Sequence, residues 1–584
     1  MNHQKIDAIA LFKNELNDEQ QSVKVNAIRR LSIVLHSPGF NSSGKADILA
    51  YLSDFAKSSD NDEVLYGLSV SLGDCQDIFK TDMIPILETL MSADETVVRD
   101  KAVDALIQLA KGSSKNDLKS KIIPFSIKMS QSDKFAQKLS ALNAMCELYP
   151  LVEEDNQKHL LDRINSMFTE ESLILRRKLA SRIGTLVKYI PKDLLIQDFL
   201  NRFKSLALDD NDSVRILCIE SLISLCEVFN DEENKQNVIP IIIQLTGDKS
   251  WRVKNHLAKN FAGLAQSLGA EISMTSLVSI FSTLLKDVEG EVRISAVNSL
   301  KNFVTILSHE KISSILAYLQ SLSRDTVPLV RCGVCEVLLA MFTMNLEKLG
   351  KDIIKTRIQP IITDLVNDED TEVKIEGLKL LKPWTRYINT SVLDLITNKT
   401  LKIDLSSKSW RVRHAELECL LDLAKIFKNG KLFDKFFKKL FFMGLKDSAY
   451  KVRQLSVIFI KDMNSFLDED YIKINLLEDV LEIANNSKLY YTYQISALYA
   501  LENFYLILKS PETRREKILS TILNMSESKV ENIRLVALKV LISIYNSKTD
   551  QEGNAKIAGY IKDTMATDSS REVCLIANRF IKAM

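Results

Sequence analysis

One stretch of the chain decides its fold: Asp209-Asp210-Asn211-Asp212-Ser213-Val214-Arg215. It is an acidic turn followed by a Val-Arg pair, after which apolar residues fall at Leu217, Cys218, Leu222 and Leu225. That spacing is typical of one face of an α-helix. Asp, Asn and Ser cap the free N–H groups at the start of a helix, and acidic charge there suits the positive end of its dipole. The stretch therefore predicts a turn that ends one helix and begins the next.

The same pattern recurs along the whole chain. Its second position, usually Arg or Lys, falls at residues 24, 65, 99, 138, 177, 215, 254, 293, 331, 374, 413, 453, 493, 534 and 574. Consecutive positions lie 34 to 43 residues apart, which is the period of HEAT repeats. Because one helix pair cannot bury both of its faces, we predict a single all-α superhelical solenoid of about 15 antiparallel helix pairs over residues 1–584. Such a repeat leaves no room for a separate catalytic domain.

Two features of the repeat predict local structure. Pro85, Pro124, Pro240 and Pro360 each lie 14 residues before the basic position of their unit. Proline removes a helical hydrogen bond, so we expect the first helix of these units to be bent. The basic residue after Val is placed to pair with the acidic turn of a neighbouring unit, which predicts a ladder of ion pairs. Since solvated pairs are individually weak, we interpret the ladder as structural rather than functional.

Composition excludes several classes of protein. Lys plus Arg (77) nearly equals Asp plus Glu (76), so we expect no nucleic-acid partner. The first residues carry no signal-peptide pattern, and the longest nearly apolar stretch, residues 329–344, is shorter than a membrane span of ~20 residues. We therefore expect no membrane partner and a cytoplasmic protein, with a nuclear pool left open. Scattered cysteines favour reduced thiols over a disulfide framework.

No motif for catalysis or cofactor binding stands out. The chain has no Gly-rich phosphate loop, His-Glu-x-x-His, Gly-x-Ser-x-Gly or cluster among its six His residues. Only Cys332 and Cys335 have the spacing of a metal or redox pair, and no second ligand pair lies nearby, so we interpret them as core residues. We predict no enzymatic activity, no cofactor and no metal.

Two segments are candidates for binding. Lys-Ser-Trp-Arg-Val occurs twice, at residues 249–253 and 408–412, and Trp beside Arg is typical of protein-binding hot spots. The alternative, that each Trp covers the end of its own unit's core, stays open here. Residues 431–442 resemble, in isolation, a basic membrane or calmodulin-target helix. They fall in the first helix of the twelfth unit, so we interpret them as packed aromatics with a lysine-covered outer face.

With its repeats located, the chain resembles the scaffold (A) subunit of protein phosphatase 2A. The resemblance rests on residues 26–32, 94–103 and 248–253 and on fifteen units over the full length. It implies a horseshoe whose turns bind the phosphatase catalytic subunit through repeats 11–15 (residues 392–584) and one exchangeable regulatory subunit through repeats 1–8 (residues 1–311). It also implies a heterodimer or heterotrimer in which the scaffold itself hydrolyses nothing.

The resemblance also implies site residues, carried over by motif. For the catalytic subunit they are Trp410, Arg411, Tyr450, Tyr490, Val530 and Asn532. For the regulatory subunit they are Asp62, Glu63, Glu95, Arg177, Trp251 and Arg252. The chain departs from the family where Leu173 replaces a proline in the fifth turn, where residues 490–493 lack a basic anchor, and where Cys574 replaces the last base. The alternative function is another HEAT scaffold or a karyopherin-like transport adaptor.

Overall fold

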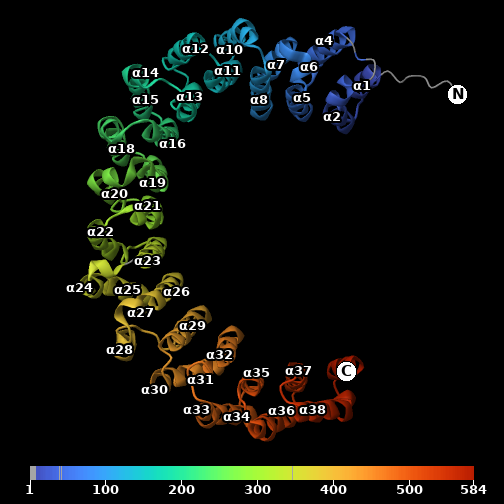
Figure 1. Ribbon diagram of the computed structural model, residues 1–584, viewed down its shortest axis with the longest axis vertical. Coiled ribbons are helices and arrows are strands. Elements are labelled where there is room, and N and C mark those ends of the chain that lie inside the picture. Colours follow the sequence, from blue (N-terminus) through green and yellow to red (C-terminus); the bar gives the residue numbers. More distant parts are fainter. Residues whose placement is uncertain (1–7, 38–39, 41, 345) are drawn as a thin grey trace, which may run out of the picture. The chain divides into compact units, whose positions relative to one another are not determined.

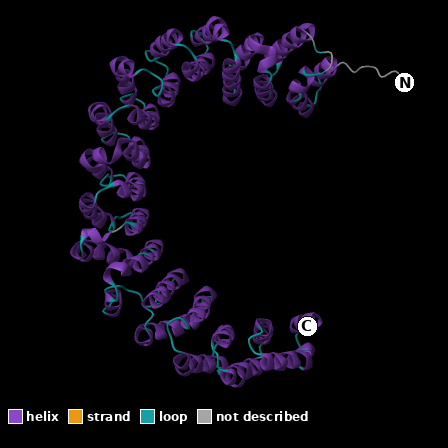
Figure 2. Ribbon diagram, viewed as in Figure 1, coloured by secondary structure: helices purple, strands orange, loops and turns teal. Residues whose placement is uncertain are grey.

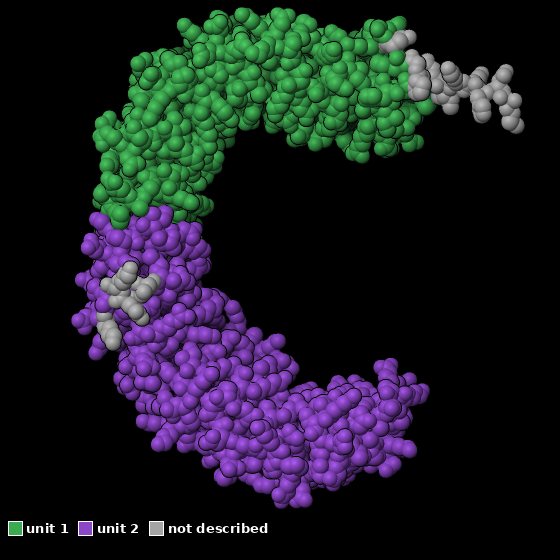
Figure 3. Space-filling model, viewed as in Figure 1, with its two compact units in different colours: residues 1–299 green, residues 300–584 purple. Residues whose placement is uncertain are grey.

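A computed structural model describes residues 8–37, 40, 42–344 and 346–584. Over those residues the chain consists of helices and connecting turns, without a strand (Figures 1 and 2). It divides into two compact units, residues 1–299 and residues 300–584 (Figure 3). The described helices form fifteen pairs of a first and a second helix, as the repeat predicts.

In each unit the first helices form one layer and the second helices another. Second helices pack on one another in chain order, as α13 on α16 and α16 on α19, and first helices do the same, as α4 on α7. The first helices of unit 1 are α1 (Ala8–Leu16), α4 (Ser42–Ser58), α7 (Ile84–Leu90), α10 (Ile123–Ser130), α12 (Glu154–Met167), α15 (Leu200–Ala207), α18 (Ile239–Thr246) and α20 (Val278–Leu284). Its second helices are α2 (Gln21–Arg29), α5 (Asp62–Asp74), α8 (Thr96–Gly112), α11 (Phe135–Leu148), α13 (Leu173–Leu186), α16 (Asp212–Val228) and α19 (Trp251–Ile272), and the chain passes into unit 2 within α21 (Gly290–Phe303).

Unit 2 repeats this arrangement. Its first helices are α22 (His309–Leu322), α25 (Gln359–Val366), α28 (Ser391–Thr397), α31 (Lys438–Leu445), α34 (Glu478–Asn485), α36 (Ser520–Met525) and α38 (Gln551–Asp563). Its second helices are α23 (Pro328–Thr343), α26 (Thr371–Lys379) with α27 (Leu381–Ile388), α29 (Trp410–Phe427), α32 (Tyr450–Met463), α35 (Tyr491–Ile507), α37 (Glu531–Ser547) and α39 (Arg571–Ala583). Short helices join these elements: α3 (Leu31–Leu35), α6 (Gln76–Phe79), α9 (Lys115–Asp117), α14 (Lys192–Leu194), α17 (Asp231–Glu233), α24 (Lys351–Ile353), α30 (Gly430–Leu432), α33 (Glu469–Ile472) and the 3₁₀ turns η1 (Lys80–Met83), η3 (Tyr149–Leu151), η7 (Val304–Ile306), η8 (Leu346–Leu349) and η13 (Met565–Thr567).

The first helices are irregular where the prolines predict it. Each of the four prolines is the second residue of its α-helix, in α7, α10, α18 and α25, a position at which its missing N–H breaks no bond. The segment before the proline is π-helical in three of these repeats and 3₁₀ in the repeat of α7. The π-helical segments are η2 (Leu118–Ile122), η4 (Leu195–Phe199), η5 (Asn234–Val238), η6 (Ser273–Leu277), η9 (Ile354–Ile358), η10 (Phe433–Phe437), η11 (Lys473–Leu477) and η12 (Thr513–Leu519). Five of them precede helices that have no proline at this position. Proline is therefore compatible with the π-helical segment but is not required for it.

The core lies between the two helix layers. Cys218, Leu222 and Leu225 are buried as their spacing predicts, whereas Leu217 is half-buried and Ile219 takes its place in the core. The aromatic segment of the twelfth repeat is also core. Phe433, Phe437 and Phe441 are buried, and the Phe433 ring stacks on Phe459 with centroids 6.2 Å apart, while Lys435 and Lys439 are exposed. The interpretation of this segment as packed aromatics under a lysine-covered face is confirmed.

The cysteines behave as core residues. All eight are free, and most are buried, including Cys335. Burial raises the pKa of the half-buried Cys332 thiol to about 11, and it raises the pKa of Cys335 further above its usual range. Thiols held in this neutral form are poor metal ligands. Within the described part of the chain, no group of three or more His, Cys, Asp or Glu side chains is placed to hold a metal ion.

Residues 251–284 are long and apolar enough, by length and composition, to cross a membrane. They form no single straight helix, because Gly269, inside α19, has a φ of 80° and kinks the helix there. Val253, Leu257 and Phe261 are buried between the helix layers. The apolar residues of this stretch therefore belong to the core of the seventh and eighth repeats.

Candidate protein-binding edge

A row of exposed side chains marks the starts of the second helices in unit 2. Trp410 begins α29, Tyr450 begins α32, Tyr490 directly precedes α35 and Val530 directly precedes α37. They are 47%, 55%, 75% and 39% exposed. Because α29, α32, α35 and α37 pack on one another in that order, these side chains lie along one edge of the unit. We call them, together with Arg411 and Asn532, the C-terminal row.

The remaining predicted residues of this row are exposed too. Arg411 donates to Glu372 Oε2 of the preceding repeat at 3.0 Å, so its guanidinium is held in place, and Asn532 lies in the first turn of α37. The Trp410 ring packs edge-on against His414, one helical turn further on, with centroids 6.5 Å apart. Six residues predicted from the sequence are therefore brought together on one exposed edge, and their binding role remains a prediction.

The second helices of unit 1 start in the same way. Trp251 begins α19 and is 41% exposed, and the other residues predicted to contact the regulatory protein are exposed as well: Asp62, Glu63, Glu95, Arg177 and Arg252. Both Trp residues therefore keep about two fifths or more of their surface in solvent. Sequence reasoning missed Val97, Phe135 and Ile174, which are exposed apolar residues in the first turns of α8, α11 and α13. Each lies two or three residues before the basic position of its repeat, close to the place that Trp251 and Trp410 occupy, and this spacing could have marked them as exposed.

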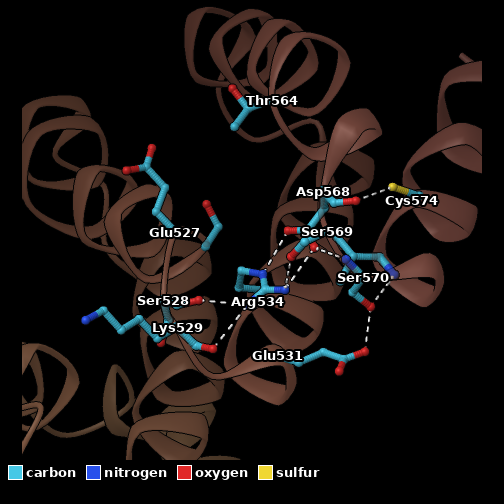
Figure 4. A network of polar contacts seen from close by, with 12 residues as sticks. Glu527, Ser528, Lys529, Glu531, Arg534, Thr564, Asp568, Ser569, Ser570 and Cys574 are labelled. Atoms are coloured by element: carbon cyan, nitrogen blue, oxygen red, sulfur yellow. Dashed lines mark hydrogen bonds and ion pairs between the residues drawn. The ribbon is translucent and has the colours of Figure 1, made fainter.

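The turns that carry these exposed residues are tied to one another by an Arg–Asp clasp. Arg534 donates through Nε and Nη2 to Asp568 of the next repeat at 2.8 and 3.0 Å, and through Nη1 to the carbonyl of Ser528 in its own turn at 2.9 Å (Figure 4). Asp568 in turn accepts from the N–H of Ser570 at 2.7 Å. The same clasp joins Arg176 to Asp209, Arg215 to Asp248, Arg331 to Asp368 and Arg413 to Asp447, and Lys254 pairs with Asp287 in the equivalent way.

The predicted ladder is confirmed, with two corrections. In the fifth repeat the base that pairs is Arg176, one residue before the counted position 177. The pairs are not solvated: in the Arg215–Asp248 clasp the two side chains are 5% and 8% exposed. Burial favours the neutral acid at Asp447, yet Arg413 and a backbone N–H hold its pKa below the usual range, and Arg534 does the same for Asp568. These carboxylates stay charged at neutral pH. Where it is present, the buried, bidentate Arg–Asp clasp orients one turn against the next.

The clasp changes in the atypical repeats. In repeat 12, Arg453 still donates to the carbonyl of Asp447 in its own turn, but its Nε donates to Ser496 Oγ at 2.9 Å where other repeats have an aspartate. In repeat 13, Tyr493 occupies the basic position. The Gln494 amide donates instead to the carbonyls of Ala484 and Asn486, both at 3.2 Å. In repeat 10, Lys374 reaches Glu416 of α29 at 2.8 Å, and only 1% of the Glu416 side chain is exposed. No sequence pattern indicated Glu416, because its carboxylate comes from a helix instead of a turn.

A further carboxylate tie joins repeats 14 and 15. Asp550, directly before α38, accepts from Arg515 Nε and Nη2 at 2.7 and 2.6 Å. Arg515 lowers the pKa of Asp550 from its ordinary 3.8 to about 2. Because the pKa is lower in the folded state, the stabilising contribution is present above about pH 4 and is lost as pH falls through about 2.

Acid titration tests this tie. We expect protonation of Asp550 to lower the free energy of unfolding of the C-terminal repeats by about 1 kcal/mol between pH 5 and pH 2. This is less than the full pKa shift would give, because solvent screens the charge of Arg515. Asp550→Asn should lack this part of the acid dependence in denaturant titrations at each pH. The exposed Asp563→Asn on the same helix is the matched control, and an Asp550→Asn profile parallel to its profile would contradict the assignment.

Comparisons with known proteins agree with this architecture. A family model described as PIK3R4-like, middle domain, matches residues 190–340. Solved structures of the karyopherins Kap121p and Kap95p superpose over 98% of this chain, with TM-scores of 0.58 and 0.53 and 15% and 14% identity, and the match covers 64% and 78% of those chains. At such low identity the likeness shows the fold alone, an all-α solenoid.

Sequence relatives are more specific. The A-type regulatory subunit of protein phosphatase PP2A from Schizosaccharomyces pombe is 29% identical over 45% of this chain and 45% of its own length. The 65 kDa regulatory protein of Homo sapiens serine/threonine-protein phosphatase 2A, in its A beta isoform, is 27% identical over 63% of this chain and 62% of its own length. The protein phosphatase 2A scaffold subunit of Dictyostelium discoideum is 26% identical over 48% of each chain. The chain thus spans about half to three fifths of the length of these relatives.

These relatives are named as regulatory and scaffold subunits, a non-catalytic role, which bears out the prediction that this chain is not an enzyme. The karyopherins share its fold at much lower identity. The chain is therefore an all-α HEAT-repeat solenoid whose sequence is similar to the scaffold subunits of protein phosphatase 2A.

Proposed function

We propose that the chain is the non-catalytic scaffold of a protein phosphatase 2A-type complex. The C-terminal row, Trp410, Arg411, Tyr450, Tyr490, Val530 and Asn532, binds the catalytic subunit. The starts of the second helices in repeats 1–8, including Trp251, bind one exchangeable regulatory subunit. The complex is a heterodimer or heterotrimer of the cytoplasm.

One observation carries the proposal: three large aromatic side chains stand exposed at the same place in three successive repeats. Trp410, Tyr450 and Tyr490 are each about half exposed or more, although a folded monomer gains nothing from leaving such area in water. Trp, Tyr and Arg are the residues that dominate the energy of protein interfaces. The resemblance to scaffold subunits supplies the identity of the partner.

The chemistry of the complex then lies in the partner. A scaffold that holds two proteins converts their encounter into an intramolecular event, so that substrate brought by the regulatory subunit meets the phosphatase at a raised effective concentration. The buried clasps serve this role because they hold the turns in place before binding, which lowers the ordering cost of association.

Affinity purification of the intact chain tests the proposal. We expect it to retain a serine/threonine phosphatase together with a second, non-catalytic protein, and the eluate to dephosphorylate a phosphopeptide. The chain alone, purified from a host without that phosphatase, should show no such activity. If the intact chain retained only nuclear-transport cargo and no phosphatase, the karyopherin-like alternative would replace this proposal.

A further inference from the structure

A groove of about 550 Å³ opens beside the C-terminal row. It lies between the segment that precedes α29 in repeat 11 and helix α31 of repeat 12. Leu405 and Phe442 are part of its lining, and Met443, 40% exposed, flanks them. The Arg413–Asp447 clasp lies in its wall. The groove therefore has an apolar floor and sits within unit 2.

The floor is held rigidly. Leu405 has a φ of 59°, a conformation that a residue with a side chain adopts only when its surroundings impose it. Its N–H donates to the buried Glu416 at 3.0 Å, and its side chain is only 6% exposed. An apolar surface fixed in this way before binding loses little entropy when a partner covers it.

Two lysines stand at the groove without acidic partners. Lys439 and Lys446 are exposed, and among the described residues neither ammonium has a carboxylate within 4.0 Å. Neighbouring cations differ: Lys438 pairs with Asp479 at 3.5 Å, and Lys425 pairs with Asp462 at 2.8 Å. A partner that brings carboxylates to these lysines and an apolar side chain to the floor complements both features.

The groove adjoins the C-terminal row. Ser448 in its lining lies two residues before Tyr450, and Arg413 lies three residues after Trp410. We propose that the groove binds an acidic surface segment of the catalytic subunit, with one bulky apolar side chain against Leu405 and Phe442 and carboxylates at Lys439 and Lys446. This inference rests on the proposed function and adds a second, charge-dependent contact to it.

Charge reversal tests the groove. The intact chain and its Lys439→Glu/Lys446→Glu variant are titrated with a purified protein phosphatase 2A catalytic subunit. We expect the double reversal to raise the Kd about tenfold and to flatten its dependence on salt. Lys431→Glu/Lys435→Glu, an equal change of charge at exposed positions of the same repeat outside the groove, should change the Kd by less than about threefold. Lys439→Arg/Lys446→Arg should bind like the intact chain, and circular dichroism should show every variant folded.

Three outcomes would overturn the inference. Unchanged binding by Lys439→Glu/Lys446→Glu, while Trp410→Ala loses binding, would remove the groove and leave the proposed function standing. An equal loss in Lys431→Glu/Lys435→Glu would show that net charge acts rather than the groove. Absence of binding by the intact chain would refute the proposed function and this inference together.

Discussion

Trp410→Ala is expected to release the phosphatase catalytic subunit from the chain. Truncating a central aromatic hot spot typically costs at least ~2 kcal/mol, which is about thirtyfold in Kd. The folded chain should tolerate the change, because Trp410 is 47% exposed and its loss leaves no cavity in the core. Titration of the purified variant with a protein phosphatase 2A catalytic subunit, beside a thermal unfolding curve, measures both quantities.

Trp251→Ala is the matched control within the same chain. It lies in the other copy of the Lys-Ser-Trp-Arg-Val pentapeptide, residues 249–253, and, like Trp410, begins a second helix after the turn. We expect this variant to keep the phosphatase and to lose a second retained protein instead. Retention of every partner by both variants would refute the assignment of the two edges. Loss of every partner by each variant alone would indicate a general defect in folding.

The sequence predicted the helix pairs correctly, and the basic position of the fifth repeat was wrong by one residue, because Arg176 pairs in place of residue 177. The Val-Arg pair repeats at the spacing of one repeat. Side-chain capping, which the sequence also predicts, is found for some second helices, as at Asn211 before α16 and Asp370 before α26. It is wrong for α19, α29, α32 and α37, whose preceding residues cap no backbone N–H. The exposure of Trp410, Tyr450 and Tyr490 follows from the same register, since the first turn of a second helix points out of the stack. The register thus predicts the fold, whereas the choice of Tyr450 and Tyr490 as binding residues came from the family resemblance.

Features that depend on contacts between repeats could not be predicted in this way. The burial of the Arg215–Asp248 clasp follows from the packing of two turns, which no single repeat encodes. The π-helical segments need a hydrogen-bond shift that residue type does not determine. Ile219 rather than Leu217 completes the buried face of α16, because that face is set by the packing of neighbouring repeats.

Glu416 is the most consequential of the residues that the sequence did not reveal. Its Oε1 lies 2.8 Å from the Lys374 ammonium, and its Oε2 accepts the Leu405 N–H at 3.0 Å. Burial raises the pKa of Glu416, and the nearby Lys374 ammonium opposes this shift. The charged form of Glu416 is therefore stabilised by the close contact with Lys374 and not by water. The residue therefore ties repeat 10 to repeat 11 and fixes the segment that leads into Trp410.

Glu416→Ala is expected to destabilise this junction by about 3–5 kcal/mol, because it leaves the Lys374 ammonium and the Leu405 N–H without their buried partner. A solenoid repeat contacts only its neighbours, so the effect should be local. Amide hydrogen exchange should accelerate over residues 366–427 and remain unchanged in unit 1. The exposed Glu418→Ala, on the same helix, should change the unfolding free energy by less than about 0.5 kcal/mol.

The double variant Lys374→Met/Glu416→Met separates the pair's charge from its packing. Two apolar side chains of similar length remove the desolvation cost of both ions, so this variant should be more stable than Glu416→Ala although it lacks both charges. If the two variants were equally unstable, the Leu405 N–H bond rather than the ion pair would hold the segment. If the double variant were stable, packing alone would be sufficient for folding at this junction. If that stable variant also bound the catalytic subunit weakly, the role of the ion pair would be to orient the turn that carries Trp410.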